Sequence, residues 1–359
     1  MSKKINGTME GLRGFLAVSV LLFHIYGSAV LEKYIVEIPK ENLFYLINYA
    51  GPISVNIFFI ISGYLIIGSL INSKTIGHFF LNRILRIYPV FLTLHLFIFS
   101  IGPIIGYKWM KDIDLVKYIV HFFSNLFLLP GIFPLPIAQI VAWSLSYEFL
   151  FYIISGIVVF IIRKNLIHNV LKYICYILLV LTCIIITSFH PNMLFFIVGV
   201  ALFLCENKLK KWYESRKVFY FNGIIFLGLM FFSYHTENFK IIVPVLLSFL
   251  FFQTVIFEHG LFSKFLNTKL LRYFGKISYS LYMWHTFVMF PLKILVPKIS
   301  FFFKVSSSFS FMIYAFLSIV LSIIISDLSY KFIEIKATGY VKKLLMKKRG
   351  DKVISSVSS

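Results

Sequence analysis

Charged residues are scarce in this chain. Only 14% of its 359 residues are Asp, Glu, Lys or Arg, against about 25% in an ordinary soluble domain. Hydrophobic residues make up 59%, and the mean hydropathy is +0.89. A soluble fold cannot cover so much apolar surface with so few charges. The composition therefore excludes a soluble globular protein, and apolar runs of about 20 residues predict an all-α polytopic membrane protein.

Acidic residues are the scarcest of the charged types: 14 Asp and Glu stand against 35 Lys and Arg, for a formal net charge of +21. In a soluble protein this excess would indicate nucleic-acid binding. In a membrane protein it is explained by basic loops on the cytoplasmic side. We therefore expect membrane lipid, and no nucleic acid, to be a partner.

Cysteine is also rare. Cys175, Cys183 and Cys205 lie in or at the edge of apolar runs, with neither metal-ligand spacing nor an even-numbered disulfide pattern. The histidines are scattered, with no two at helix spacing near a carboxylate. The sequence predicts no metal site and three cysteines that act as small core residues.

Apolar runs long enough to span a bilayer recur along the chain. With ten spans both ends lie on one side, and most Lys and Arg fall in the segments on that side. Both termini are therefore predicted to be cytoplasmic, in a multi-pass protein of the cell inner (plasma) membrane. The predicted spans are 11–31, 50–71, 87–106, 141–162, 171–188, 192–206, 218–235, 240–257, 277–297 and 309–333.

The domain organisation follows from these spans. Residues 1–340 are predicted to form one transmembrane domain, and the basic, Ser-rich residues 341–359 a disordered cytoplasmic tail. The longest outer segment, about 107–140, holds three prolines that argue against a continuous helix. The first span resembles a signal peptide at its small-residue end, but its length favours a retained span.

Two ionisable residues stand in the first span, GLRGFLAVSVLLFHIYGS. Arg13 and His24 lie eleven residues apart, about 20° from the same helix face and about 16 Å apart along the axis. Such residues at membrane depth cost several kcal/mol unless something local compensates. One interpretation is a polar stripe that runs from the cytoplasmic edge past the membrane centre. The other is a snorkelling arginine and a hydrogen-bonded core histidine.

A basic pair opens the third span in the stretch FFLNRILRIYP. Arg83 and Arg86 are three residues apart, so they share a helix face as this span begins. Two guanidiniums at a cytoplasmic membrane edge suit a phosphorylated ligand, because each binds phosphate through a bidentate fork. Simple topology anchors that contact lipid phosphate remain the alternative.

Two further spans carry ionisable residues. Glu148, in AWSLSYEFLFY, lies about seven residues into the fourth span. It is either functional or a structural partner of a buried arginine. His285, in FGKISYSLYMWH, lies about eight residues into the ninth span among aromatic residues. It is interpreted as a packing or site-shaping residue.

Taken in order, these stretches resemble the membrane-bound acyltransferase-3 family, which includes bacterial O-acetyltransferases of surface polysaccharides. The chain departs from the family pattern at Glu10, at Ser54, Val55 and Asn56, and at Lys336, where the family often has Asp, a Gly-Val-Asp-like triplet and Pro. The stretches that carry the resemblance are GLRGFLAVSVLLFH, NIFFIISGYLI, FFLNRILRIYP, WSLSYEFLFY, GKISYSLYMWH and YKFIE.

The resemblance implies a reaction and a set of roles. Acetyl-CoA or another acyl-CoA would be the co-substrate, with no permanently bound cofactor, and a hydroxyl of a glycan or lipid-linked saccharide would be the acceptor. Arg13, Arg83 and Arg86 would bind the donor. His24 would act as general base or take the acyl group itself, and Glu148 would assist it. The residues expected to shape the site are Asn56, Tyr88, Trp143, Ser146, Tyr279, Tyr282 and His285.

A transporter or flippase of a lipid-linked sugar or small polar solute is the rival class, because its translocation path would also need buried charges. Transporters of this kind often show internal repeats or inverted halves. No such repeat is visible in this sequence. The arginine pair suited to a phosphate ligand also favours the acyltransferase, while the oligomeric state is left open.

Overall fold

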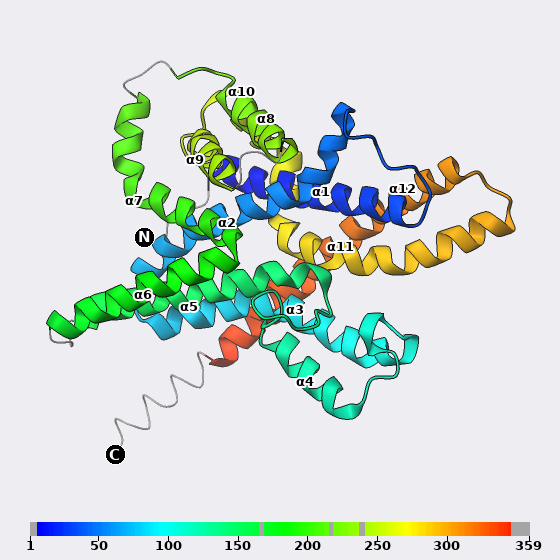
Figure 1. Cartoon of the computed structure of the whole chain (residues 1–359), viewed down its shortest axis with the longest axis horizontal. Helices are drawn as coiled ribbons and strands as arrows, with labels where there is room; N and C mark the ends of the chain where they lie inside the picture. Colours follow the sequence, from blue (N-terminus) through cyan, green and yellow to red (C-terminus); the bar gives the residue numbers. More distant parts are fainter. Residues whose placement is uncertain (1–5, 165–168, 215–217, 237–240, 346–359) are drawn as a thin grey trace.

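The computed structural model describes residues 6–164, 169–214, 218–236 and 241–345, which form helices joined by loops (Figure 1). Within these ranges seven helices are long and apolar enough to cross a membrane. α9 and α10 together are also long and apolar enough, but they are bent by 66° at the break between them, and two shorter apolar helices cover Ile177–Phe189 and Asn222–His235. These segments coincide with the ten predicted spans, which confirms an all-α polytopic membrane protein.

Twelve α-helices are present in the described ranges, with a π-helix at Tyr330–Ala337 after α12. Their bounds are α1 Gly7–Leu31, α2 Ile47–Ile71, α3 Ile76–Ile105, α4 Leu115–Leu126, α5 Trp143–Lys164, α6 Asn169–Phe189, α7 Leu194–Glu214, α8 Asn222–His235, α9 Ile242–Ile256, α10 Gly260–Leu266, α11 Lys269–Phe302 and α12 Ser307–Ser329.

Several helices extend well beyond the apolar runs that predicted them. α3 begins at Ile76, where the Thr75 side chain caps the helix by accepting from the His78 amide, instead of at residue 87. Arg83 and Arg86 therefore lie inside α3 and not at its start. In α11, His285 lies midway along the helix. Hydropathy detects only the lipid-immersed part of a helix, so polar ends that stay helical are missed.

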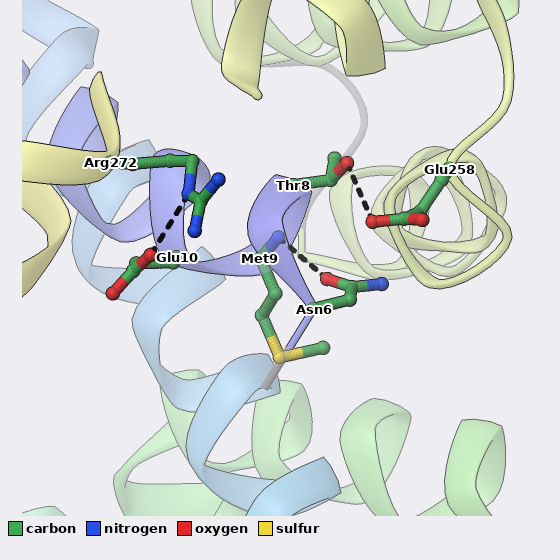
Figure 2. Close-up of polar contacts among 6 residues, drawn as sticks. All are labelled: Asn6, Thr8, Met9, Glu10, Glu258 and Arg272. Atoms are coloured by element: carbon green, nitrogen blue, oxygen red, sulfur yellow. Dashed lines mark hydrogen bonds and ion pairs between the residues drawn. The ribbon is translucent and has the colours of Figure 1, made fainter. Parts of the chain in front are cut away.

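The start of α1 is held by a local cap and by polar contacts to the chain just before α10 and to the start of α11 (Figure 2). The Asn6 side chain caps the helix by accepting from the Met9 amide at 2.7 Å. Thr8 donates to Glu258 at 3.2 Å, and Arg272 pairs with Glu10 at 3.1 Å. These contacts fix the height of α1 against α10 and α11, and so they fix where the side chains farther along α1 lie.

Glycines let α1 and α11 approach closely. A Cβ on Gly14 would lie 2.1 Å from the Leu271 carbonyl oxygen, and one on Gly275 would lie 2.0 Å from the Glu10 carbonyl oxygen. Helix pairs in membranes use small residues in this way, because packing replaces the hydrophobic driving force that water would supply. The same device joins α2 to α7, where a Cβ on Gly63 would lie 2.2 Å from the Phe196 carbonyl oxygen.

The long outer segment is interrupted by irregular chain, as its prolines predicted. α4 ends at Leu126, and irregular chain leads to the short 3₁₀ helix Ile140–Ala142 before α5. Asn125 holds the return, because its side chain donates to the Pro136 carbonyl and accepts from the Ala138 amide, both at 2.9 Å. No continuous helix spans this segment.

Two details of the prediction are modified or left open. Cys183 is half-buried, but Cys205 is exposed, so the expectation that it is a core residue is wrong. It lies on an outward face of α7, where lipid can cover a small apolar side chain. The Cys175 side chain and residues 346–359 of the predicted tail lie outside the described parts, and helix continues as far as Leu345.

Candidate active site

An inner cavity with about 780 Å³ of empty space is lined by four charged residues. α1 supplies Arg13, α3 supplies Arg83 and Arg86, and α5 supplies Glu148. The structure therefore unites both predicted basic elements and the predicted carboxylate, which lie far apart in the sequence. The other polar side chains that line this inner cavity are Ser62, Ser144, Ser278, Tyr279 and Tyr282.

Glu148 has its own hydrogen-bond partners in the inner cavity. Its Oε1 accepts from Ser62 Oγ at 2.9 Å and from the hydroxyl of Tyr152, which is fully buried. Arg83 donates to Ser69 Oγ at 2.9 Å, and its guanidinium lies 5.5 Å from the centre of the Phe79 ring. Both side chains are thus held in place before any ligand binds.

An outer cavity of about 920 Å³ contains His24 and is lined by uncharged side chains. Asn56 and Trp143, two of the predicted site-shaping residues, lie in its wall. Asn192 and Tyr234 line it as well, and Asn56 donates to the Tyr234 hydroxyl. Sequence reasoning missed Asn192 and Tyr234, because a single amide or tyrosine near the end of an apolar run carries no distinguishing signal.

His285 lies directly behind His24. The two imidazole ring centres are 5.0 Å apart, and His285 is only 1% exposed. His285 Nδ1 is 3.0 Å from the Leu281 carbonyl oxygen. A carbonyl only accepts, so this nitrogen carries the proton and Nε2 is left as an acceptor. Nε2 has no hydrogen-bond partner among the described residues.

Tyr282 and Val55 line both cavities and separate them. The Tyr282 hydroxyl shares a hydrogen bond with Ser144 Oγ at 2.8 Å. Its ring centre lies 6.1 Å from those of both Phe58 and His285. Arg13 and His24, on one helix, thus open into different cavities on either side of one aromatic side chain.

Three of the predicted site-shaping residues donate hydrogen bonds to backbone carbonyls of neighbouring segments. Tyr88 donates to the Leu126 carbonyl at 3.1 Å and Ser146 donates to the Pro130 carbonyl, so both hold the outer segment and line neither cavity. Tyr279 does line the inner cavity, and its hydroxyl donates to the Ile87 carbonyl at 2.6 Å.

Glu334 is a charged residue near the inner cavity that the residue-level reasoning did not select. It lies in the π-helix, accepts from Ser280 Oγ at 2.5 Å, and interacts electrostatically with Arg86 and Arg13. π-Helical turns often occur at functional sites. The available signal was its place in the YKFIE stretch. Among the described residues, no group of three or more metal-ligating side chains forms.

The family profile described as Acyltransferase domain, the acyltransferase-3 profile, matches residues 6–330. The chain belongs to the acyltransferase-3 family. The matched residues include the lining of both cavities and end just before Glu334. Membership of this family makes the protein a membrane acyltransferase, and the resemblance noted in the sequence is confirmed.

One relative of this acyltransferase-3 protein comes from Haemophilus influenzae. It is an uncharacterized protein that is 30% identical over 207 residues, which cover 52% of this chain and 76% of the relative. No solved structure gives a significant match to the chain. The arrangement of the two cavities therefore stands on the geometry described above.

Proposed function

We propose that this acyltransferase-3 protein is an O-acetyltransferase of the inner membrane. It would move an acetyl group from cytosolic acetyl-CoA to a hydroxyl of a cell-surface or exported glycan. One observation carries the proposal: an arginine-lined cavity and a histidine-containing neutral cavity meet at Tyr282. A transferase that joins a phosphate-rich donor to an uncharged hydroxyl acceptor needs such a pair of sites.

The donor side rests on three guanidiniums. Arg13, Arg83 and Arg86 line one cavity, and each can bind phosphate oxygens through two parallel N–H donors. When no ligand is bound, the Glu148 carboxylate stabilises part of this positive charge, because a carboxylate favours the charged form of nearby cations. In this proposal the arginines bind the phosphates of CoA, and the thin pantetheine arm carries the thioester toward Tyr282.

The chemical step is assigned to His24. Its neutral imidazole accepts the proton of the acceptor hydroxyl as the hydroxyl oxygen attacks the thioester carbonyl. The carbon–sulfur bond of the thioester then breaks, and the CoA thiolate accepts this proton from the imidazolium of His24. The His285 ring lies beside this imidazolium, with the two ring centres 5.0 Å apart. An alternative order, in which the acetyl group first passes to His24 itself, uses the same residues.

The acceptor side rests on aromatic and amide groups. Trp143 and Tyr234 offer flat apolar faces, and Asn56 and Asn192 offer both donors and acceptors. Such a mixture suits a sugar ring, which has apolar faces and hydroxyl edges. Glu148 lies with the arginines, so its proposed assistance acts on donor placement and not through direct contact with His24.

The decisive experiment supplies labelled acetyl-CoA to the purified protein in lipid discs, together with extracted cell-surface glycan. We expect label to enter the glycan as a base-labile ester, and His24→Ala to abolish this. A transporter or flippase would transfer no label, and it would instead move its solute across vesicles. Failure of the wild-type protein to acetylate any glycan fraction, together with solute uptake, would overturn the proposal.

A further inference from the structure

A third hollow opens on the side of the bundle and has a lining separate from those of the two cavities. This lateral groove lies between α3 residues 97–105 and α11 residues 286–295, with Tyr107 and Gln139 in its wall. It has about 1260 Å³ of empty space and an almost wholly apolar lining. Phe97, Ile105 and Leu295 on its edges are 45%, 55% and 51% exposed. The groove therefore opens toward the lipid that such an apolar surface requires.

Two lysines stand at one end of the lateral groove. The Tyr107 and Phe290 rings touch, with centres 5.0 Å apart. The Lys108 ammonium lies 5.2 Å from the first ring centre, and the Lys293 ammonium lies 5.8 Å from the second. Desolvation and the nearby Lys293 lower the pKa of Lys108. Two nearby ammonium groups repel each other, so this end of the lateral groove favours the binding of an anion.

The protein neutralises only part of this charge. Lys293 pairs with Glu32 at 3.3 Å. Lys108 donates to the Ala138 carbonyl at 3.1 Å, which is a neutral acceptor. One positive charge is therefore left without a carboxylate among these contacts. A phosphate between the two ammonium groups would accept charge-assisted hydrogen bonds from both.

A buried polar group in the groove wall also lacks a partner. Gln139 is 5% exposed, and its Nε2 donates to the Met283 carbonyl at 2.8 Å. Its Oε1 is buried with no hydrogen-bond partner among the described residues. A buried acceptor without a partner costs about 1–3 kcal/mol. A ligand that donates a hydrogen bond to this oxygen would therefore be stabilised here. A ligand hydroxyl is such a donor.

The lateral groove shares its inner wall with the outer cavity. On α11, His285 faces His24, while its neighbour Thr286 lines the groove. In the segment before α5, Gln139 lines the groove, while Ile140 lines the outer cavity. A molecule whose chain lies in the groove and whose headgroup lies at the two lysines is thus one layer of protein from the proposed acceptor site.

We propose that the lateral groove binds the hydrocarbon chain of a phosphate-bearing lipid that carries the acceptor glycan. The phosphate lies between Lys108 and Lys293, and the attached sugar extends toward the outer cavity. This inference rests on the proposed glycan acetylation, and it names the form in which the acceptor arrives. The basic end favours a lipid phosphate over a neutral lipid.

Binding is tested on the full-length protein in detergent, with a long-chain polyisoprenyl phosphate as the probe and the matching neutral polyisoprenol as its comparison. Native mass spectrometry or quenching of tryptophan fluorescence reports the affinity. We expect the phosphate to bind about tenfold or more tightly than the alcohol. Combined Lys108→Gln and Lys293→Gln should remove this preference, while Lys298→Gln, an exposed lysine on the same helix, should leave it unchanged.

A second variant tests the groove itself. Ile101→Trp fills the groove and should weaken binding of both probes, whereas Leu178→Trp on the exposed face of α6 should not. Equal binding of the two probes, or an unchanged affinity in both groove variants, would overturn the proposal. So would equal competition by ordinary anionic phospholipid. Loss of dimers on Ile101→Trp would instead identify a second copy of the chain as the occupant.

Activity separates this inference from the proposed function. Groove variants should lose transfer to lipid-linked glycan but keep transfer to a water-soluble fragment of the same glycan. If the wild-type protein acetylates neither acceptor yet binds the lipid phosphate, the proposed function fails and the binding site stands. If both acceptors are acetylated equally well by every variant, the groove has no part in acceptor delivery and the inference is wrong.

Discussion

The inner and outer cavities lie on either side of one tyrosine, yet they differ in charge. The inner cavity is lined by Arg13, Arg83, Arg86 and Glu148, whereas the described lining of the outer cavity contains no Lys, Arg, Asp or Glu. Charges at membrane depth are expensive, so an arginine cluster persists where a ligand or a carboxylate supplies the opposite charge. His24, in contrast, must be neutral to act as a base, and a cavity without charged side chains suits the neutral form of imidazole.

This difference separates binding from chemistry along one helix. If Arg13 and His24 opened into a single cavity, the arginines would place positive charge beside the base and oppose the imidazolium that forms during transfer. The wall formed by Tyr282 and Val55 keeps the two environments apart. Variants on the two sides should therefore change different kinetic quantities.

His24→Ala should give the largest effect. Loss of a general base typically costs about 10²–10⁴ in rate, so acetyl transfer should fall by at least that factor while CoA affinity stays within about twofold. His78→Ala, at an exposed site near the start of α3, is the matched control and should leave both quantities unchanged. Wild-type turnover in His24→Ala would make this histidine a packing residue.

Arg83→Ala and Arg86→Ala should show the opposite pattern, with weaker CoA binding. Each removes a charge-assisted hydrogen bond to phosphate, worth about 1.5–3 kcal/mol, or about 10–150-fold in affinity. Titration of CoA against each purified variant measures this. Lys74→Gln, an exposed residue of the neighbouring loop, controls for general charge. Unchanged affinity in the double variant would return the arginines to topology anchors.

Gly14→Ala should damage both cavities together, because it forces α1 away from α11. The added Cβ would lie 2.1 Å from the Leu271 carbonyl oxygen, and overpacking of this kind costs about 1–3 kcal/mol. Gly27→Ala is the matched control, since nothing lies within 4 Å of its added Cβ. Thermal unfolding of the two variants in the same detergent measures the difference. Equal stability would contradict the close helix crossing.

Tyr282→Phe should give the smallest effect and sharpen the boundary between the cavities. It keeps the aromatic wall but removes the hydroxyl that bonds Ser144, a loss of about 0.5–1.5 kcal/mol. We expect transfer to fall a few-fold and uncoupled hydrolysis of acetyl-CoA to rise, because the wall becomes less rigid. Ser144→Ala should reproduce this. A Tyr282→Phe defect as large as that of His24→Ala would place the tyrosine in the chemistry.

Sequence reasoning recovered the elements of the site better than their grouping. Arg13 and His24 lie on one helix, as their apolar run predicted, and the paired Arg83 and Arg86 line one cavity. The prediction that the third span begins at residue 87 was wrong about the start of α3, because the polar turns before residue 87 remain helical. Glu148 was expected to orient His24 or to position the acceptor, and the packing of α5 places it in the inner cavity with the arginines.

Other residues could not have been identified from their sequence alone. Tyr234 and Asn192 come from segments more than a hundred residues beyond His24, and each sits in an ordinary apolar context. Glu334 interacts with Arg13 and Arg86 because of its place in the π-helix, which the sequence does not indicate. A pairwise contact between distant spans leaves no local pattern of hydropathy or charge.

The amino-acid sequence by itself determined that this chain lies in a membrane, which segments cross it, and which ionisable side chains are carried to membrane depth. These properties follow from local composition, because the transfer of each residue into lipid is nearly independent of its distant neighbours. Only the tertiary structure decided that Arg13 and His24 open into separate cavities. That outcome depends on how closely glycines let α1 approach α11 and on where Tyr282 of α11 then lies.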